Sequence, residues 1–103
     1  MTNTTSKIKI EILVDAPLVR RITELAESVG VTGYTVMRTI GGSGSGGRWS
    51  EDQLTGAQNK VVFVTVTGPR RADTLIEALK PVLDSHGLML TKSHVEVIRG
   101  DRF

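Results

Sequence analysis

The sequence predicts a single α+β domain with a ferredoxin-like βαββαβ fold, in which an antiparallel sheet carries both helices on one face. Two observations support this fold. Apolar residues alternate with a period of two in several short segments, and they recur at helical spacing in two longer ones. These segments follow one another in the order strand, helix, strand, strand, helix, strand, which is the split βαβ pattern. The 103 residues are therefore expected to form one domain, residues 1–103.

The first half of the chain contains two predicted strands and a helix between them. Isoleucine and valine alternate with mainly polar residues over 8–14, which predicts the first strand. Asp15 is expected to cap the following helix through its side chain, Pro17 fits its first turn, and Gly30 ends it. The β-branched and aromatic residues of 33–40 predict the second strand.

The second half begins with a long apolar run over 60–68, which predicts a central strand. A helix is expected from Pro69 to Gly87. Pro81 lies inside it, has no backbone N–H and clashes with the preceding turn. The sequence therefore predicts a kink, or a break into two short helices, near Leu79.

The last strand is predicted at 94–99, with a short strand at 88–90 as an optional addition before it. With both helices on one face of the sheet, the other face would carry Leu13 and, depending on the strand register, Val62, Val64 and Val66. No further segment is left to cover this apolar face, so we expect subunits to associate through it.

The composition excludes several classes of protein. Hydrophobic residues make up 39% and charged residues 23%, as in soluble globular domains, and no apolar run reaches the roughly 20 residues of a membrane span. The N-terminal residues contain no signal-peptide core, and cysteine is absent, so a cytoplasmic protein without disulfides is expected. The 13 basic and 11 acidic residues are spread along the chain, which argues against nucleic-acid binding.

A glycine- and serine-rich tract opens the long connection at 41–58. It contains the spacing G-x-G-x-x-G, but no apolar helix follows, so the dinucleotide-binding interpretation is rejected. A flexible linker is an alternative that fits the composition. Connections between neighbouring strands need only about two to five residues, so the length favours a functional loop.

Several side chains in this loop suit ligand or partner binding. Unshielded backbone N–H groups can form an anion-binding nest, and Ser43, Ser45 and Arg48 add donors to it. Trp49, the only tryptophan, is expected to contact a partner or ligand, although it could instead fold back on its own domain.

The remaining candidates lie outside the loop. His86, next to Gly87, is a candidate ligand contact, although an exposed histidine at a helix end is the simpler interpretation. Arg99 and Arg102 suit a polyphosphate, or else belong to a solvated tail. The sequence contains no metal-ligand cluster and no recognisable set of catalytic residues, so we expect neither a metal site nor an enzyme.

Three stretches, VGVTGYTVMRTIGG (29–42), NKVVFVTV (59–66) and VEVIRG (95–100), resemble the PII signal-transduction superfamily over nearly the whole chain. The chain is most similar to the PII-like branch linked to carboxysomes and to the regulation of bicarbonate transporters. The resemblance implies a homotrimer that binds ADP or AMP between subunits, or cyclic AMP in some members, together with bicarbonate. It also implies that the loop at 41–58 is a flexible T-loop that docks on a transporter or an enzyme.

The resemblance assigns roles to individual residues. Thr35 would lie by the adenine, Lys60 would reach an acidic effector, and Arg99 would lie near the phosphates, with Arg102 a looser match. The expected nucleotide-binding residues are Thr35, Gly41, Gly42, Ser43, Gly44, Arg48, His86, Gly87, Arg99 and Arg102. The expected bicarbonate or anion site comprises Ser45, Gly46, Gly47, Arg48 and Lys60.

Two departures from the typical PII pattern limit what the resemblance implies. DSHGLML, at 84–90, stands where typical members have Thr-Gly-x-x-Gly-Asp-Gly-Lys, which argues against triphosphate chelation and against 2-oxoglutarate and magnesium chemistry. The loop has no tyrosine to be uridylylated, since Tyr34 lies at its root. A slow nucleotide hydrolase and a ligand-free structural adaptor remain as alternative functions.

Overall fold

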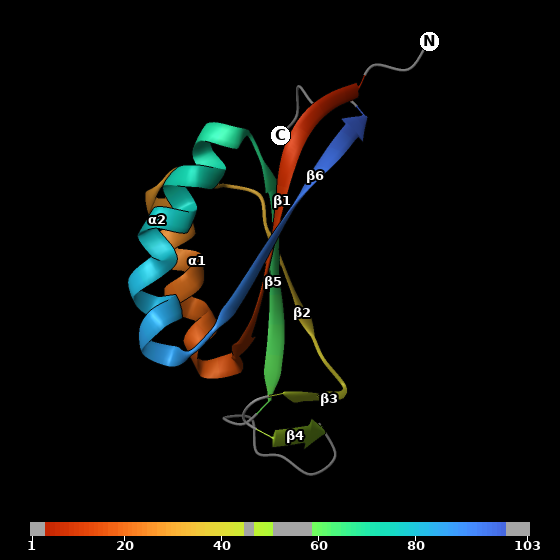
Figure 1. Ribbon diagram of the computed structural model, residues 1–103, viewed down its shortest axis with the longest axis vertical. Coiled ribbons are helices and arrows are strands. Elements are labelled where there is room, and N and C mark those ends of the chain that lie inside the picture. The colour runs from red at the N-terminus through yellow and green to blue at the C-terminus, as the bar shows by residue number, and fades with distance from the viewer. Residues whose placement is uncertain (1–3, 45–46, 51–58, 99–103) are drawn as a thin grey trace.

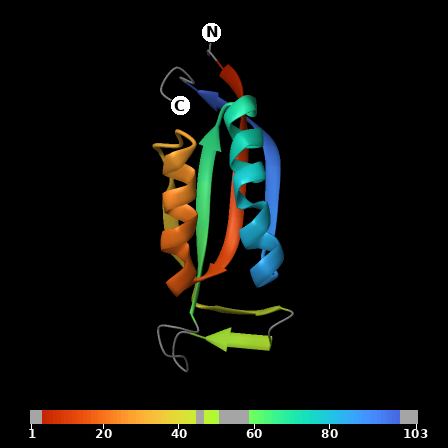
Figure 2. The ribbon, with the colours of Figure 1, turned by 90° about the vertical axis from the view of Figure 1, so that its left-hand side faces the viewer.

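The computed structural model describes residues 4–44, 47–50 and 59–98. Its elements are β1 (Thr4–Asp15), the 3-10 turn η1 (Ala16–Leu18), α1 (Val19–Ser28), β2 (Thr35–Arg38), β3 (Gly41–Gly44), β4 (Gly47–Ser50), β5 (Lys60–Thr67), α2 (Pro69–His86) and β6 (Met89–Ile98). An antiparallel sheet has the strand order β2-β5-β1-β6, and α1 and α2 lie side by side on one of its faces (Figures 1 and 2). The ferredoxin-like fold predicted from the sequence is confirmed.

The core lies between the sheet and the two helices. Alternate side chains of the central strands β1 and β5 point toward the helices, and Ile10, Ile12 and Phe63 are fully buried there. They pack in one cluster with Ile22 of α1 and Leu75 of α2. Each such side chain contributes about 1.5–3 kcal/mol by leaving water, so this face of the sheet is the main source of stability.

The start of α1 differs from the sequence prediction. Pro17 lies in the first turn as expected, but that turn is 3-10, and the Asp15 side chain makes no capping hydrogen bond. The Asp15 carboxylate instead binds the Lys60 ammonium, with Oδ1 and Nζ 2.7 Å apart. The capping prediction was wrong because the antiparallel register of β1 and β5 places Lys60 directly opposite Asp15.

Of the two outcomes predicted near Leu79, the break is wrong, because α2 runs without interruption from Pro69 to His86 with Pro81 inside it. The kink stays a prediction. Pro81 is exposed, whereas the neighbouring Leu79 and Val82 are buried at 0% and 1% exposure. Burial of these two side chains offsets the hydrogen bond that the proline cannot donate. Gly87 then ends α2 in the left-handed conformation, with φ 61°, as its position predicted.

The two edge strands differ in length from their predictions. β2 is shorter than predicted, spanning Thr35–Arg38, and the Gly33 carbonyl before it accepts a hydrogen bond of 2.6 Å from the Thr65 hydroxyl. β6 is one continuous strand, so the segments predicted at 88–90 and 94–99 are joined. It pairs with β1 from Met89 to Ile98, and this long partner keeps the strand unbroken.

The face of the sheet opposite the helices carries the apolar side chains expected there. Leu13 lies opposite Val62 on one side and Met89 on the other, and Val62 in turn lies opposite Met37. These four residues form an apolar row across all four strands. Val64 and Val66 continue the same face along β5, and no described element covers it (Figure 1).

The beginning of the 41–58 loop has regular structure. β3 and β4 pair as an antiparallel hairpin beyond one end of the main sheet (Figures 1 and 2). Residues 45–46 and 51–58 lie outside the described residues, so the predicted flexibility of the whole loop stays a prediction.

Candidate functional site

Trp49 and Thr39 connect the hairpin to the main sheet. Trp49, on β4, donates a hydrogen bond of 2.9 Å from its indole Nε1 to the Thr39 hydroxyl oxygen. The same hydroxyl donates to the backbone carbonyl of Lys60 over 2.7 Å. A hydroxyl can donate one hydrogen bond and accept others, so Thr39 uses both capacities to join β4 to the first residue of β5.

The Lys60 side chain also lies at this junction. Its ammonium is 2.7 Å from the Asp15 carboxylate and 5.5 Å from the centroid of the Trp49 ring, a cation–π distance. The Lys60 side chain is 26% exposed and that of Asp15 is 51% exposed. The cation is thus partly shielded, and it interacts with both the body of the domain and the hairpin.

The Trp49 indole packs directly on the backbone of β3. A Cβ atom placed on Gly42 would lie 2.5 Å from both Cζ2 and Cη2 of the indole. Real side chains do not approach this closely, so the ring and any residue other than glycine cannot occupy these positions together. The same atom on Gly44 would lie 4.0 Å from Cζ3, an ordinary contact.

The hairpin geometry changes the interpretation of the glycine tract. Consecutive N–H groups in an extended strand point to opposite sides, so the β3 segment does not form the predicted nest in this conformation. Ser43 instead lies directly opposite Arg48 in the ladder, which places a hydroxyl and a guanidinium at neighbouring positions. Ser45 and Gly46 lie outside the described residues, while Gly47 begins β4 with φ 103°.

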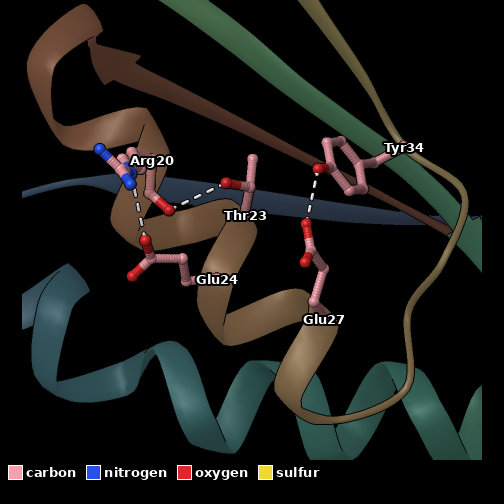
Figure 3. Close-up of polar contacts among 5 residues, drawn as sticks. All are labelled: Arg20, Thr23, Glu24, Glu27 and Tyr34. Carbon is pink, nitrogen blue, oxygen red and sulfur yellow. Dashed lines mark hydrogen bonds and ion pairs between the residues drawn. The ribbon is translucent and has the colours of Figure 1, made fainter.

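Tyr34 fixes the root of β2 against α1 (Figure 3). Its hydroxyl donates a hydrogen bond of 2.8 Å to the Glu27 carboxylate, and its ring stacks on Phe63 with centroids 5.4 Å apart. The hydrogen bond to Glu27 raises the pKa of Tyr34, with smaller contributions from desolvation and from the negative charge of Glu27. These contacts position Thr35, the predicted adenine neighbour, at the first residue of the exposed edge strand β2.

The end of α2 and the end of β6, which lead to the predicted residues outside the hairpin, lie at different ends of the domain. The C-terminal end of α2, which carries His86 and then Gly87, points toward the hairpin end of the molecule (Figures 1 and 2). The strand that leads to the two C-terminal arginines ends at Ile98, opposite Thr4, at the other end of β1. The ends of β1 are about 35 Å apart at roughly 3.3 Å per residue. Arg99 and Arg102 themselves lie outside the described residues.

Sequence reasoning missed two members of the junction. Thr39 was considered only as a strand-forming residue, and Asp15 only as a helix cap. The contact between Asp15 and Lys60 follows from pairing β1 with β5 in antiparallel register, which the predicted strand order already implied. The Thr39 contact depends on the position of the hairpin, which the glycine-rich sequence did not reveal.

The fold and this junction define a ferredoxin-like domain in which a hairpin begins the long connection between β2 and β5. The family model described as "Nitrogen regulatory protein P-II" matches residues 7–102. The chain therefore belongs to the P-II family of regulatory proteins, and the resemblance to the PII superfamily inferred from the sequence is confirmed. No curated protein matches the chain in sequence at a significant level.

Solved structures of CPII, a nitrogen regulatory PII-like protein from Thiomonas intermedia K12, are similar over the whole or nearly the whole chain. CPII bound to ADP, AMP and bicarbonate is 20% identical with a TM-score of 0.90, covering 100% of this chain and 98% of that one. CPII bound to ADP and bicarbonate is 20% identical with a TM-score of 0.88, covering 100% and 99%. CPII bound to ADP, AMP and acetate is 20% identical with a TM-score of 0.80, covering 98% and 97%. At this identity the likeness establishes the fold.

Within the part of the chain that the structure describes, neither helix is long and apolar enough to cross a membrane.

Proposed function

We propose that this P-II family member is a cytoplasmic, non-enzymatic sensor that binds ADP or AMP together with bicarbonate in the clefts between the subunits of a homotrimer. It would signal through the 41–58 loop to a partner in carbon acquisition, such as a bicarbonate transporter. The observation that carries the proposal is the hairpin, which brings a glycine strand, Arg48 and Lys60 to one end of the sheet. Glycine backbone, guanidinium and ammonium are groups suited to phosphates and small planar anions.

The ligand assignment has independent support from CPII, whose structures contain ADP with bicarbonate and ADP and AMP with acetate. Both anions are small, planar and singly charged, which matches what one partly shielded lysine can bind. Lys60 is the candidate for this contact, and Arg48 is the candidate for the nucleotide phosphates.

The trimer assignment rests on two features of the subunit. The apolar row of Met37, Val62, Leu13 and Met89 crosses the open face of the sheet, and the exposed fractions of Leu13, Met37 and Met89 are 37%, 47% and 73%. A second copy of the chain is the partner proposed for this apolar surface, and in a trimer each copy would present it to a different surface of its neighbour. The hairpin and the end of β6 also lie at opposite ends of β1, so a site that uses residues from both would need two subunits.

Transmission through the loop requires that ligand binding favour one of its conformations. The hairpin is held to the sheet by the contacts of Trp49 and Thr39, so its position can respond to groups that bind beside it. The Trp49 indole is partly exposed while it contacts Gly42 and Thr39, and release from these two residues would present more of its surface to a partner.

Isothermal titration calorimetry with ADP, AMP, ATP and cyclic AMP, each with and without bicarbonate, tests this function. ADP or AMP should bind, with bicarbonate changing the affinity, and light scattering should give the mass of a trimer. Absence of binding by every nucleotide would sink the proposal. Release of AMP or phosphate on long incubation would instead identify a nucleotide hydrolase.

A further inference from the structure

The Asp15 carboxylate lies beside the Lys60 ammonium, the cation to which the proposed function assigns a small anion. Asp15 Oδ1 lies 2.7 Å from Lys60 Nζ, so the two form a close ion pair between the end of β1 and the start of β5. A carboxylate and a bicarbonate ion present similar oxygen acceptors to an ammonium group. The ion pair with Asp15 therefore lowers the positive charge that Lys60 offers to another anion.

The same ammonium stabilises the hairpin through Trp49. It lies 5.5 Å from the centre of the indole ring, where a cation is attracted to the ring face. The indole Nε1 is also hydrogen-bonded to the Thr39 hydroxyl, and the ring lies on Gly42. A Lys60 side chain that moved to bind an anion would weaken one of the contacts that hold Trp49 in place.

We propose that Asp15, Thr39, Trp49 and Lys60 form a latch that holds the β3–β4 hairpin against the end of the sheet, and that an anion bound at Lys60 opens it by displacing Asp15. The anion part rests on the function proposed above. The latch itself depends only on contacts within the chain.

The closed latch contains features that favour opening. The Asp15 side chain is 51% exposed, so water can solvate its carboxylate once Lys60 has left. The Lys60 side chain is itself 26% exposed, so a small anion can reach its ammonium from solvent. A ligand that binds one position of the hairpin better than the other would shift their populations.

Fluorescence of Trp49, the only tryptophan, tests the latch without ligand. Thr39→Val keeps the shape of the side chain but removes the acceptor of the indole hydrogen bond, and Gly42→Ala places a methyl group 2.5 Å from the ring. Both should shift the emission to longer wavelength and increase quenching by acrylamide. Gly44→Ala is the matched control and should leave the emission unchanged, since its methyl group would lie 4.0 Å from the ring.

Circular dichroism of the same variants shows whether the domain remains folded. Folded Thr39→Val and Gly42→Ala proteins with the emission and quenching of the unaltered protein would overturn the latch. Thr39→Val also provides a second route to the answer if Gly42→Ala fails to fold.

Titration with sodium bicarbonate at constant ionic strength, followed by the same emission, tests the opening step. Bicarbonate should shift the Trp49 emission of the unaltered protein in the direction seen for Thr39→Val. Asp15→Asn should bind bicarbonate about two- to fivefold more tightly. This factor corresponds to the free energy of a partly exposed ion pair, here that of Asp15 with Lys60, which the variant removes. Glu77→Gln, which breaks the Glu77–Lys80 pair of 2.9 Å on the exposed side of α2, should bind as the unaltered protein does.

The outcomes separate the latch from the proposed function. If no nucleotide or bicarbonate binds but Thr39→Val still releases Trp49, the sensor function fails and the hairpin contacts stand. Normal ligand binding with an emission that neither the ligand nor the variants change would overturn the latch alone. Equal bicarbonate affinity in Asp15→Asn and the unaltered protein would show that Asp15 does not compete, and would overturn the opening step.

Discussion

The Tyr34 hydroxyl lies 2.8 Å from Oε1 of Glu27 and donates a hydrogen bond to it, which ties the root of β2 to the last turns of α1 (Figure 3). Tyr34 also stacks on Phe63 in the core. The predicted adenine neighbour, Thr35, follows immediately. The pair therefore sets where the exposed edge of the sheet begins relative to the helix layer.

Tyr34 should ionise at a higher pH than an ordinary tyrosine, because the neutral hydroxyl is hydrogen-bonded to Glu27 and the phenolate would face its negative charge. Tyr34 is the only tyrosine, so ultraviolet absorbance reports its ionisation directly. Glu27→Gln should lower the pKa of Tyr34 toward its usual value. Glu24→Gln, on the same helix but paired with Arg20, is the control and should leave it unchanged.

This raised pKa also predicts how stability depends on pH. A group whose pKa is higher in the folded state stabilises the fold below its unfolded-state pKa, and that contribution is lost as the pH rises through the folded-state pKa. The stability difference between the unaltered protein and Tyr34→Phe should thus be present at neutral pH and shrink above the ordinary tyrosine pKa of 10.0. Urea denaturation of both proteins at several pH values measures it, and a difference that grows with alkaline pH would contradict the assigned cause.

Pro81→Ala should increase the free energy of unfolding by about 1–2 kcal/mol, because alanine restores a helical hydrogen bond and has the higher helix propensity. The unfolded chain is more flexible with alanine than with proline, and this offsets part of the gain. Pro81 is exposed within the continuous helix α2, so the change leaves the core packing intact. Urea denaturation checks the result. Asp84→Ala, an exposed change on the same helix, should stay within about 0.5 kcal/mol of the unaltered protein.

The sequence predicted those parts of the fold that burial patterns determine. The alternation in β1 and β5 identified the strands and the buried face, because one face of each strand is fully covered by the helices. The helix break that the sequence allowed at Pro81 does not occur, because burial of Leu79 and Val82 outweighs a local helix-breaking preference. Local propensity gave the wrong answer there because tertiary packing contributes more free energy.

The candidate site was only partly predictable for a different reason. Gly42, Arg48 and Lys60 were recognised from residue type and from the family resemblance, and the structure brings Arg48 and Lys60 onto or beside the hairpin. The contact between Thr39 and Trp49 could not be derived, because glycine has no strong preference for a strand and the tract gave no pattern for the hairpin. Contacts that depend on a segment without a burial pattern are visible only in three dimensions.

Leu13→Lys should dissociate the assembled protein into monomers, because it places a charge in the centre of the apolar row on the open face of the sheet. Light scattering and sedimentation velocity measure the mass. Val36→Lys is the matched control: Val36 has a similar exposure, 41% against 37% for Leu13, but its register partner Phe63 places it on the helix side. An assembled Leu13→Lys protein would show that the subunits do not associate through this face.

Arg48→Ala should weaken ADP binding by roughly 1–3 kcal/mol, the scale of a hydrogen bond to a charged group. Arg48 lies on β4 opposite Ser43, in the same hairpin as Gly41, Gly42 and Gly44. Its exposed side chain is available to a phosphate. Calorimetry measures the change. Arg70→Ala is the control. Arg70 lies in the first turn of α2, which follows the end of β5 opposite to Lys60, and the variant removes the same charge far from the hairpin. A general electrostatic effect would therefore appear in both variants. Equal losses in the two would mean that Arg48 attracts the nucleotide only through net charge, whereas a loss confined to Arg48→Ala would identify a direct phosphate contact.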